Sequence, residues 1–460
     1  MKILAPLVLL CTLNYHSSLA SEDGFHGIIS PTNQKIYGQA LEAIFTMGFR
    51  LQDILNMSTE QNLVVSPLST AAIIGQLMIG ADGEFREDLH DLLGLPPSSA
   101  SFNVTYFGKE RNESLILPYA TFHMQLAILI KNLRQRKPGE EFILNLANAM
   151  FHNSDIDLRT VFTSSLNKMY DADIVPLDFT KDTTRIINQW ASDRTNGLIK
   201  SFLSSPPPSS TASMFLNSIY FYAEWETPFS DALNHMDTFT VSPSHNVSVL
   251  YMVGKMEDVP YVETKHYKLV CLPYKNRELG MYIFLPNIHH EHKYDIRKFL
   301  ASLDPKEIVD SLSNMKNRSV DVKMPKLHLT NTISLLKPLQ KYATYKKIED
   351  NRTRQRNGNS LDNLVNQLKQ YQNFTRPAYT DIYLDNAARG VNLKVSDIFQ
   401  QTIFSVNEKG TEAASVTAGT TFYEGGSKSL FLGRPFSFFI RHEETQATIY
   451  WGTITNPDKH

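Results

Sequence analysis

The spacing of apolar residues predicts that helices dominate the first part of the chain. Apolar side chains recur at helical intervals over residues 36–55. A short apolar strand at residues 62–68 leads into a helix that begins near Pro67, a residue that suits the first turn, and continues to residue 81. Another helix is expected over residues 84–93, ending at Gly94.

Strands dominate the later part of the chain. Short runs rich in β-branched and aromatic residues predict strands. They cover residues 142–150, 214–222, 238–240, 267–272, 280–285, 319–324, 399–407, 429–432, 436–441 and 448–454. Further helices are expected over residues 158–170 and around 187–190. Helices followed by strands favour an α+β fold with antiparallel or mixed sheets.

Two polar stretches interrupt this pattern. Residues 96–115 are rich in Pro and Ser, and residues 346–381 contain arginines among Asn, Gly and Ser. Polar segments of this kind rarely form regular elements. We therefore predict two irregular insertions.

A segment near the C-terminus, residues 407–421, is typical of a strand with one face of small side chains. Alternate residues of a strand point to the same face. The small set comprises Thr411, Ala413, Ser415, Thr417, Gly419 and Thr421. Gly410 supplies a conformationally permissive joint, and no proline occurs between Gly410 and Ser429. We predict a loop that can later join a sheet as a strand.

The N-terminus predicts secretion. Lys2, an apolar run over residues 3–13 and a small-residue cleavage site at residues 18–20 are typical of a signal peptide, residues 1–20, so the mature chain is expected to begin at Ser21. Sequons for N-glycosylation fit an extracellular protein. They occur at Asn56, Asn103, Asn112, Asn246, Asn317, Asn351 and Asn373, and we expect only some to be used.

Composition narrows the class of protein further. The chain has 460 residues, 42% of them hydrophobic, and a formal net charge of −2, which indicates no general attraction to nucleic acid. The apolar run of the signal is too short to span a bilayer, and no later stretch is long enough, so no membrane insertion is expected. Cys271 is the only cysteine beyond the signal, which excludes an intramolecular disulfide and favours a buried thiol.

Enzyme motifs are absent. The sequence contains no G-x-S-x-G, HExxH or GxxxxGK[ST] pattern, and we predict a protein that is not an enzyme. Residues 289–292, His-His-Glu-His, could bind a metal, but they lie between a strand and a polar segment. A solvated loop without metal is the favoured interpretation.

Six motifs, in the same order over some 370 residues, resemble the serpin family. They are Asn-Leu-Val-Val-Ser-Pro-Leu-Ser-Thr at 62–70, Leu-Asn-Leu-Ala-Asn-Ala-Met-Phe at 144–151, Ile-Asn-Gln-Trp at 187–190 with Thr-Asn-Gly at 195–197, Leu-Asn-Ser-Ile-Tyr-Phe-Tyr-Ala-Glu-Trp at 216–225, Leu-Pro-Tyr-Lys at 272–275, and Val-Asn-Glu-Lys-Gly-Thr-Glu-Ala-Ala at 406–414 followed by Gly-Arg-Pro-Phe at 433–436. The resemblance implies a single domain over residues 21–460, with three β-sheets, about eight or nine helices and an exposed reactive-centre loop over about 408–434.

The resemblance also assigns roles to residues. The hinge of the reactive loop corresponds to Glu408, Lys409, Gly410, Thr411, Glu412, Ala413, Ala414, Ser415, Val416 and Thr417. Ser66 and Ser69 correspond to the shutter beneath the main sheet, and Asn217 and Trp225 lie near the shutter and the breach, where the loop enters. The usual shutter histidine is Gln400 here, which can donate and accept hydrogen bonds but cannot become charged. Any histidine-based pH sensitivity at that point is therefore lost.

Family spacing, counted from Thr411 and from Pro435, places the scissile bond at Glu424-Gly425. Glu424 would suit a protease with a basic primary pocket, whereas Tyr423 would suit a chymotrypsin-like pocket, and the two receive similar weight. Lys428 would suit a trypsin-like pocket but would lengthen the loop. The expected partner is an extracellular serine protease of the chymotrypsin fold, inhibited by a monomer through loop insertion.

Two alternatives stay open from the sequence. A non-inhibitory serpin that acts as a carrier, chaperone or ligand would share the fold, although the small, proline-free hinge argues against it. No cofactor is required, but the basic cluster at residues 134–137, Arg-Gln-Arg-Lys, could bind a heparin-like polysaccharide. Plain solvated surface is the favoured interpretation of that cluster.

Overall fold

The chain was analysed as a computed structural model. It describes residues 30–55, 61–96, 101–107, 112–134, 142–195, 197, 199–303, 305–342, 381–411 and 427–459. Within these ranges lie eight complete α-helices, and residues 336–342 form one more helical segment at the edge of its range. The prediction of an α+β fold with about eight or nine helices is confirmed.

Most helices come early, as the apolar spacing predicts. The α-helices are α1 (Pro31–Ile54), α2 (Pro67–Gly80), α3 (Gly83–Leu92), α4 (Ala120–Arg134), α5 (Thr160–Tyr170), α6 (Thr184–Arg194), α7 (Ile296–Ala301) and α8 (Pro305–Ser313). Short 3-10 turns cover Asp231–Leu233 and Lys275–Arg277. Every residue of α2 is buried, and Ser66 caps its N-terminus by accepting a hydrogen bond from the Ser69 amide. A helix buried on all sides marks the centre of the molecule.

Strands follow one another through the rest of the chain. They are β1 (Leu63–Val65), β2 (Ser101–Phe107), β3 (Asn112–Pro118), β4 (Phe142–Asn153), β5 (Ala172–Leu177), β6 (Ser213–Glu224), β7 (His235–Ser242), β8 (His245–Glu263), β9 (Tyr267–Pro273), β10 (Leu279–Pro286), β11 (Lys316–Pro325), β12 (Leu327–Ser334), β13 (Ile382–Leu384), β14 (Leu393–Val395), β15 (Asp397–Val406), β16 (Gly410–Thr411), β17 (Lys428–Phe431), β18 (Phe436–His442) and β19 (Thr448–Ile454).

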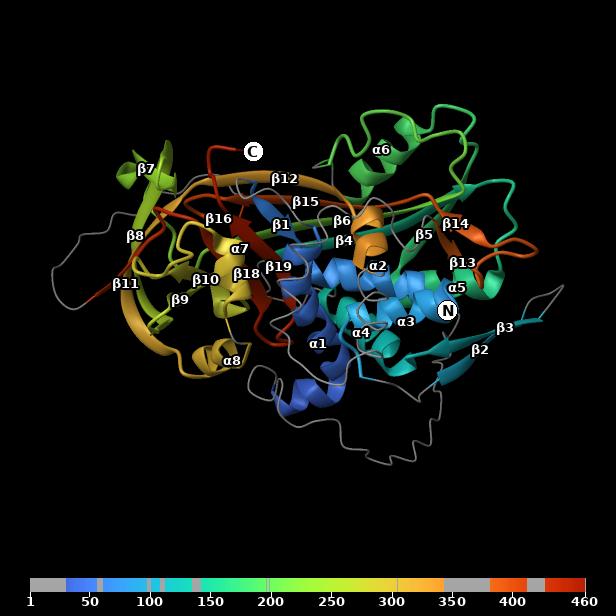
Figure 1. The fold of residues 1–460 in the computed structure, drawn as a ribbon, viewed down its shortest axis with the longest axis horizontal. Helices are drawn as coiled ribbons and strands as arrows, with labels where there is room; N and C mark the ends of the chain where they lie inside the picture. Colours follow the sequence, from blue (N-terminus) through green and yellow to red (C-terminus); the bar gives the residue numbers. More distant parts are fainter. Residues whose placement is uncertain are drawn as a thin grey trace, which may run out of the picture.

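The six-stranded sheet is the main sheet of the molecule. Its order is β12-β15-β6-β4-β5, with β16 paired to β6 beside this path. The long strands β12, β15, β6 and β4 run side by side, with α6 over one face and α2 beneath the other (Figure 1). The pairing of β15 with β6 is parallel, from Asp397 opposite Met214 to Ile403 opposite Tyr220.

The second large sheet has nine strands in the order β1-β19-β18-β10-β9-β8-β11-β17, with β7 paired to β8. The long strand β8 joins two groups within it. Its first half pairs with β7 and its last residues pair with β9, while β11 pairs along much of its length. The expected three sheets are therefore present, with the second and third continuous through β8.

The first insertion is not irregular. Within residues 96–115, the described part forms a hairpin of β2 with β3, in antiparallel register from Ser101 opposite Pro118 to Phe107 opposite Asn112. Burial along β3 alternates, with Leu115 and Leu117 facing the core. The alternation of buried and exposed residues occurs in a stretch rich in Pro and Ser, which explains why the prediction of an irregular insertion was wrong. Of the second insertion, only residue 381 lies within the described residues.

A large apolar core holds the fold together. Cys271 is buried within it, as predicted, and burial raises the pKa of its thiol to about 12. Among the described helices, none is long and apolar enough to cross a membrane.

Candidate functional site

A tight turn connects β15 to β16 at one end of the main sheet. The Asn407 amide donates to the Gly410 carbonyl at 2.8 Å, and the Gly410 amide donates back to the Asn407 carbonyl at 3.2 Å. The Asn407 side chain closes the turn by accepting from the Lys409 amide at 3.0 Å. The chain therefore reverses direction directly after β15.

After this turn, the first hinge residues already lie in the sheet. Gly410 pairs with Glu224 and Thr411 pairs with Ala223, in the antiparallel sense. The pairing of β15 with β6 ends at Tyr220, so β16 occupies the next stretch of β6. We expected the loop to be exposed from residue 408, but residues 408–411 are part of the sheet end. This prediction was wrong because pairing with β6 satisfies backbone groups that a loop would leave to water.

Gly410 makes an unusually close backbone approach. A Cβ atom at this position would lie 2.1 Å from the Ala223 carbonyl oxygen and 2.6 Å from Glu224 Cα. The neighbours are backbone atoms and cannot rotate away. Only glycine fits the turn in this form.

Trp225 holds the turn from the side of β6. Its amide donates to the Lys409 carbonyl at 2.6 Å, and its indole nitrogen donates to the Asn407 carbonyl at 3.0 Å. The ring is buried and stacks on Tyr274, with centroids 4.4 Å apart. The predicted place of Trp225, where the loop enters the sheet, agrees with these contacts.

Glu408 is a buried charge at the same place. Its carboxylate forms an ion pair with Lys326 at 2.5 Å and accepts from Asn234, while its carbonyl accepts from the Phe229 amide. Burial alone would raise the pKa of Glu408, but the hydrogen bonds from Lys326 and Asn234 outweigh burial and lower it. The carboxylate stays ionised and anchors the hinge. Lys326 and Asn234 were missed because neither stands near Glu408 in the sequence.

The shutter lies beneath the middle of the main sheet, at the N-terminus of α2. Ser69 Oγ donates to Asn217 Oδ1, and both side chains are fully buried. On the next strand, Gln400 Oε1 accepts from the Ser66 amide at 3.3 Å, and Gln400 Nε2 donates to the Thr70 hydroxyl at 3.0 Å. One turn of helix thus joins β6 to β15 from below.

Gln400 and Asn217 stand directly opposite each other across the two strands. The structure therefore brings together Ser66, Ser69, Asn217 and Gln400, as the sequence predicts, and glutamine satisfies both hydrogen-bonding partners offered by α2. Asn148 was missed. It lies opposite Asn217 on β4, accepts from Asn217 Nδ2 at 2.9 Å and donates to the Tyr170 carbonyl. An asparagine inside an apolar strand is the signal that could have identified it.

The other end of the loop is fixed in the nine-stranded sheet. Lys428 is the first residue of β17, which pairs in parallel with β11, and it lies 3.8 Å from Glu263. Ser427 donates to Asp321. Lys428 as the cleaved residue would require β17 to leave the sheet, so this alternative is disfavoured.

Several predicted residues lie outside the described residues. They are Tyr423, Glu424 and Gly425 at the scissile bond, Glu412, Ala413, Ala414, Ser415, Val416 and Thr417 in the hinge, and the sequons at Asn56, Asn351 and Asn373. The sequon residues Asn103, Asn112, Asn246 and Asn317 are exposed. Of the basic cluster at 134–137 only Arg134 is described, and it is paired with Asp171.

In the histidine-rich stretch at residues 289–292, His290 and His292 pack against other rings. His290 packs between His266 and His292, with centroids 5.6 and 5.8 Å away. Across the described part of the chain, no group of three metal-ligating side chains converges.

Known proteins share this architecture. Thyroxine-binding globulin, in complex with thyroxine, superimposes with a TM-score of 0.68 at 19% identity, over 91% of this chain and 99% of that chain. The thermophilic serpin tengpin in its native state gives 0.68 at 23% identity, over 92% and 94%. At these identities the likeness shows the fold alone.

Sequence comparison identifies the family. The family profile described as Serpin (serine protease inhibitor) matches residues 42–457. Serine protease inhibitor 28Dc of Drosophila melanogaster is 27% identical, over 93% of this chain and 80% of that protein. Human Serpin B13 is 23% identical, over 91% of this chain and all of that protein. Because this profile spans most of the chain, the chain belongs to the serpin family, which is described as a family of protease inhibitors rather than of enzymes.

Proposed function

We propose that this serpin is a secreted inhibitor that traps a serine protease of the chymotrypsin fold by inserting its cleaved loop into the main sheet. The observation that carries the proposal is β16, because Gly410 and Thr411 already pair with β6 in the antiparallel sense. Serpin loop insertion is a known case of strand addition to a sheet. The hinge stands at the first step of that process.

The register of β16 determines which loop residue would pair with which residue of β6. Continued along β6, it places Thr417 opposite Asn217, since Gly410 pairs with Glu224 and each step along the loop is one step back along β6. Gln400 already stands opposite Asn217, so Thr417 would enter between the two shutter side chains. Its hydroxyl can bond to either of them.

The same register explains the small side chains. Odd-numbered loop residues would face the side of β6 that carries Phe215, Ile219 and Phe221, which belong to the main core. A large or charged side chain there would clash or bury an unpaired group. Each ladder hydrogen bond gained contributes about 1 kcal/mol, so the completed strand strongly favours insertion.

The cut is proposed at Glu424-Gly425, with Tyr423 as the alternative residue before the cut. The protease serine would attack the carbonyl of that residue and form an acyl-enzyme. Insertion then carries the tethered enzyme along the sheet before water can release it. Secretion follows from the N-terminal signal pattern, which is characteristic of export.

The test incubates the secreted protein with acid-specific, chymotrypsin-like, trypsin-like and elastase-like proteases. An inhibitor forms an adduct that survives denaturant, and the C-terminal fragment identifies the cut. A fragment that starts at Gly425 supports Glu424, and one that starts at Glu424 assigns the cut to Tyr423. Cleavage without adduct in every case would overturn inhibition and favour a carrier, chaperone or ligand.

A further inference from the structure

Loop insertion requires β6 and β15 to separate along their whole length. Neighbouring strands lie about 4.8 Å apart, so a new strand moves β15 away from β6 by about that distance. The end of these strands opposite Trp225, here called the far end, must open last. There β15 begins at Asp397, opposite Met214.

Two segments meet at the far end. Residues 154–159 follow β4 and lead into α5, on the β6 side of the opening line. Residues 386–389 lie between β13 and β14 and lead toward β15 on the other side. The Arg159 amide donates to the Ala387 carbonyl, and the Arg389 amide donates to the Asp157 carbonyl, both at 2.9 Å.

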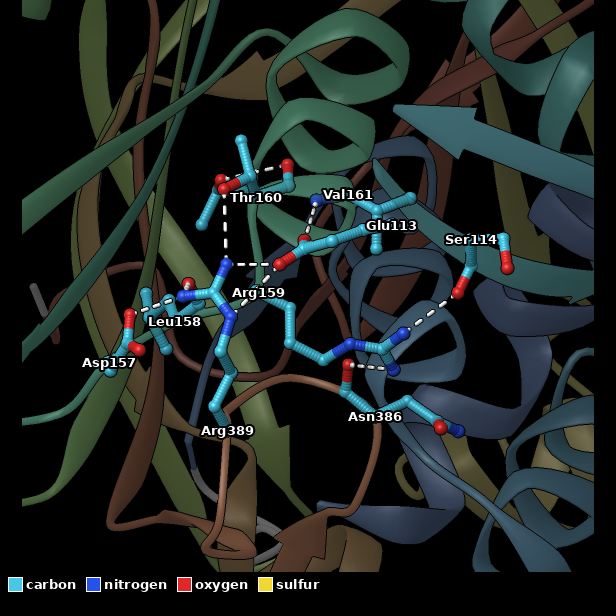
Figure 2. Close-up of polar contacts among 10 residues, drawn as sticks. Glu113, Ser114, Asp157, Leu158, Arg159, Thr160, Val161, Asn386 and Arg389 are labelled. Atoms are coloured by element: carbon cyan, nitrogen blue, oxygen red, sulfur yellow. Dashed lines mark hydrogen bonds and ion pairs between the residues drawn. The ribbon is translucent and has the colours of Figure 1, made fainter. Parts of the chain in front are cut away.

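Arg389 is the centre of this junction (Figure 2). Its guanidinium forms ion pairs with Glu113 and Asp157, and it donates to the Leu158 carbonyl at 3.0 Å and to the Thr160 hydroxyl at 3.3 Å. One side chain thus reaches the hairpin, the segment after β4 and the first turn of α5.

Glu113 strengthens the junction from the hairpin. It is buried, and Oε2 accepts from the Val161 amide at 3.0 Å, which caps α5 from a distant element. Burial by itself raises the pKa of Glu113, but hydrogen bonds from Arg389 and Val161 outweigh it and lower the pKa. Arg159 adds a bond to the Ser114 carbonyl at 2.8 Å and another to the Asn386 carbonyl at 3.3 Å.

These contacts join parts that insertion must separate. Hydrogen bonds of about 3 Å cannot survive a displacement near 4.8 Å if each segment follows its own strand. On the other side, Asn386 is held to the end of α2 through the Gly80 carbonyl at 2.9 Å. Residues 386–389 are therefore fixed to the central helix, whereas residues 154–159 continue directly from the end of β4.

We propose that Arg389 is a positioning residue for inhibition, a latch that keeps the far end of the main sheet closed and sets the rate of complete loop insertion. The effect on trapping rests on the proposed inhibitory function. The latch itself, as a bond across the opening line, does not. Removing it speeds insertion and shifts the reaction from cleavage toward trapping.

The test compares Arg389→Ala and the double variant Glu113→Gln/Arg389→Ala with wild type. In the double variant the buried Glu113 carboxylate is replaced by an amide, so no buried charge is left without Arg389 as its partner. The loop is cut by a protease found to cleave within residues 421–426, and insertion is followed by tryptophan fluorescence and by resistance to heat. Both variants are expected to insert about tenfold faster, because the loss of one charged hydrogen bond across the opening line corresponds to about a tenfold change in rate.

Arg194→Ala is the matched control. Arg194 also forms an ion pair with a carboxylate, Asp173, but both residues lie on the β6 side of the line. Its insertion rate should stay within about twofold of wild type. With a target protease, Arg389→Ala should give a larger adduct fraction, whereas a merely destabilised fold would give an equal or smaller one.

Hydrogen exchange tests the Arg389 latch independently of the proposed inhibitory function. The Ser396 amide, bonded to the Ser213 carbonyl across the line, should exchange faster in intact Arg389→Ala than in Arg194→Ala. Wild type that never inserts after cutting would overturn the inhibitory function and leave this exchange result as the test of the latch. Unchanged exchange at Ser396, or insertion no faster than wild type, overturns the latch.

Discussion

At the residue scale, Gly410 shows how one missing side chain admits a strand. The turn brings its Cα against the backbone of Ala223 and Glu224, where a methyl group has no space. Hinge composition is thus a packing requirement as well as a matter of flexibility.

We expect Gly410→Ala to expel β16 from the sheet. The added Cβ would meet the Ala223 carbonyl oxygen at 2.1 Å, so the turn must open. Slower insertion should raise the ratio of cleaved protein to adduct severalfold, measured on denaturing gels. Gly38→Ala is the control, because the added methyl meets only the flexible Gln34 side chain. An unchanged ratio in Gly410→Ala would contradict a role for the observed turn.

His123 provides a second residue-scale test. It is completely buried, bonded to the Tyr170 hydroxyl, and burial together with nearby Arg86 lowers its pKa from 6.5 to about 3. The unfolded chain therefore binds a proton between pH 6.5 and 3 that the folded protein does not. The free energy of unfolding therefore loses nothing to His123 protonation above pH 6.5. As the pH falls from 6.5 toward 3, protonation of His123 in the unfolded chain lowers the free energy of unfolding by up to about 1.4 kcal/mol per pH unit.

Urea unfolding across this pH range measures the effect. His123→Gln cannot titrate, so the difference in stability between wild type and variant should fall with decreasing pH below 6.5. A difference that stays constant with pH would show that His123 is not the titrating group.

At the element scale, α2 joins the two strands that would part in the proposed loop insertion. Its first turn bonds to Gln400 on β15 and to Asn217 on β6. Motif matching on the sequence correctly identified this joint, because its residues stand in short contiguous patterns. The junction of Glu113 with Arg389 could not be found that way, since 276 positions separate the two residues.

Gln400→Ala should loosen that joint. It leaves the Ser66 amide and the Thr70 hydroxyl without their partner on β15, which costs about 1–3 kcal/mol of unfolding free energy. Gln401→Ala is the neighbouring control, on the opposite face of the same strand, because the Gln401 amide nitrogen donates to the Thr332 hydroxyl on β12 rather than to α2. Thermal and urea unfolding of both variants measure the difference, and equal losses would contradict a special role for Gln400.

At the scale of the whole molecule, runs of β-branched and aromatic residues predicted most strands, and only tertiary contacts define the rest. Strand β8 contains Gly254 and Pro260, which break its pattern, although its pairing with β11 continues on both sides of them. The two-residue strand β16 exists only because β6 offers an open edge there. Local sequence carries no signal for β8 as one long strand, and at residues 410–411 it indicates a possible strand but not its pairing with β6.

Secretion and glycosylation are tested on the whole protein. Four sequon asparagines are exposed, so an N-linked glycan can be accommodated at each: Asn103, Asn112, Asn246 and Asn317. Expression in a secreting eukaryotic cell should give medium-borne protein that shifts to lower mass on glycosidase treatment. At each sequon in use, a single Asn→Gln change should remove one increment of this mass shift. Protein that stays inside the cell with no shift would contradict secretion.

The anchoring of β17 beside β11 determines where the two new chain ends lie after cleavage. In the proposed mechanism, residues after the cut would stay fixed through Ser427 and β17, while the acylated end would travel along the twelve residues of β6. At about 3.3 Å per residue, the new amino group and the ester carbonyl would finish about 40 Å apart. The amine that could reverse acylation would then no longer reach its ester, so the cut could not be resealed.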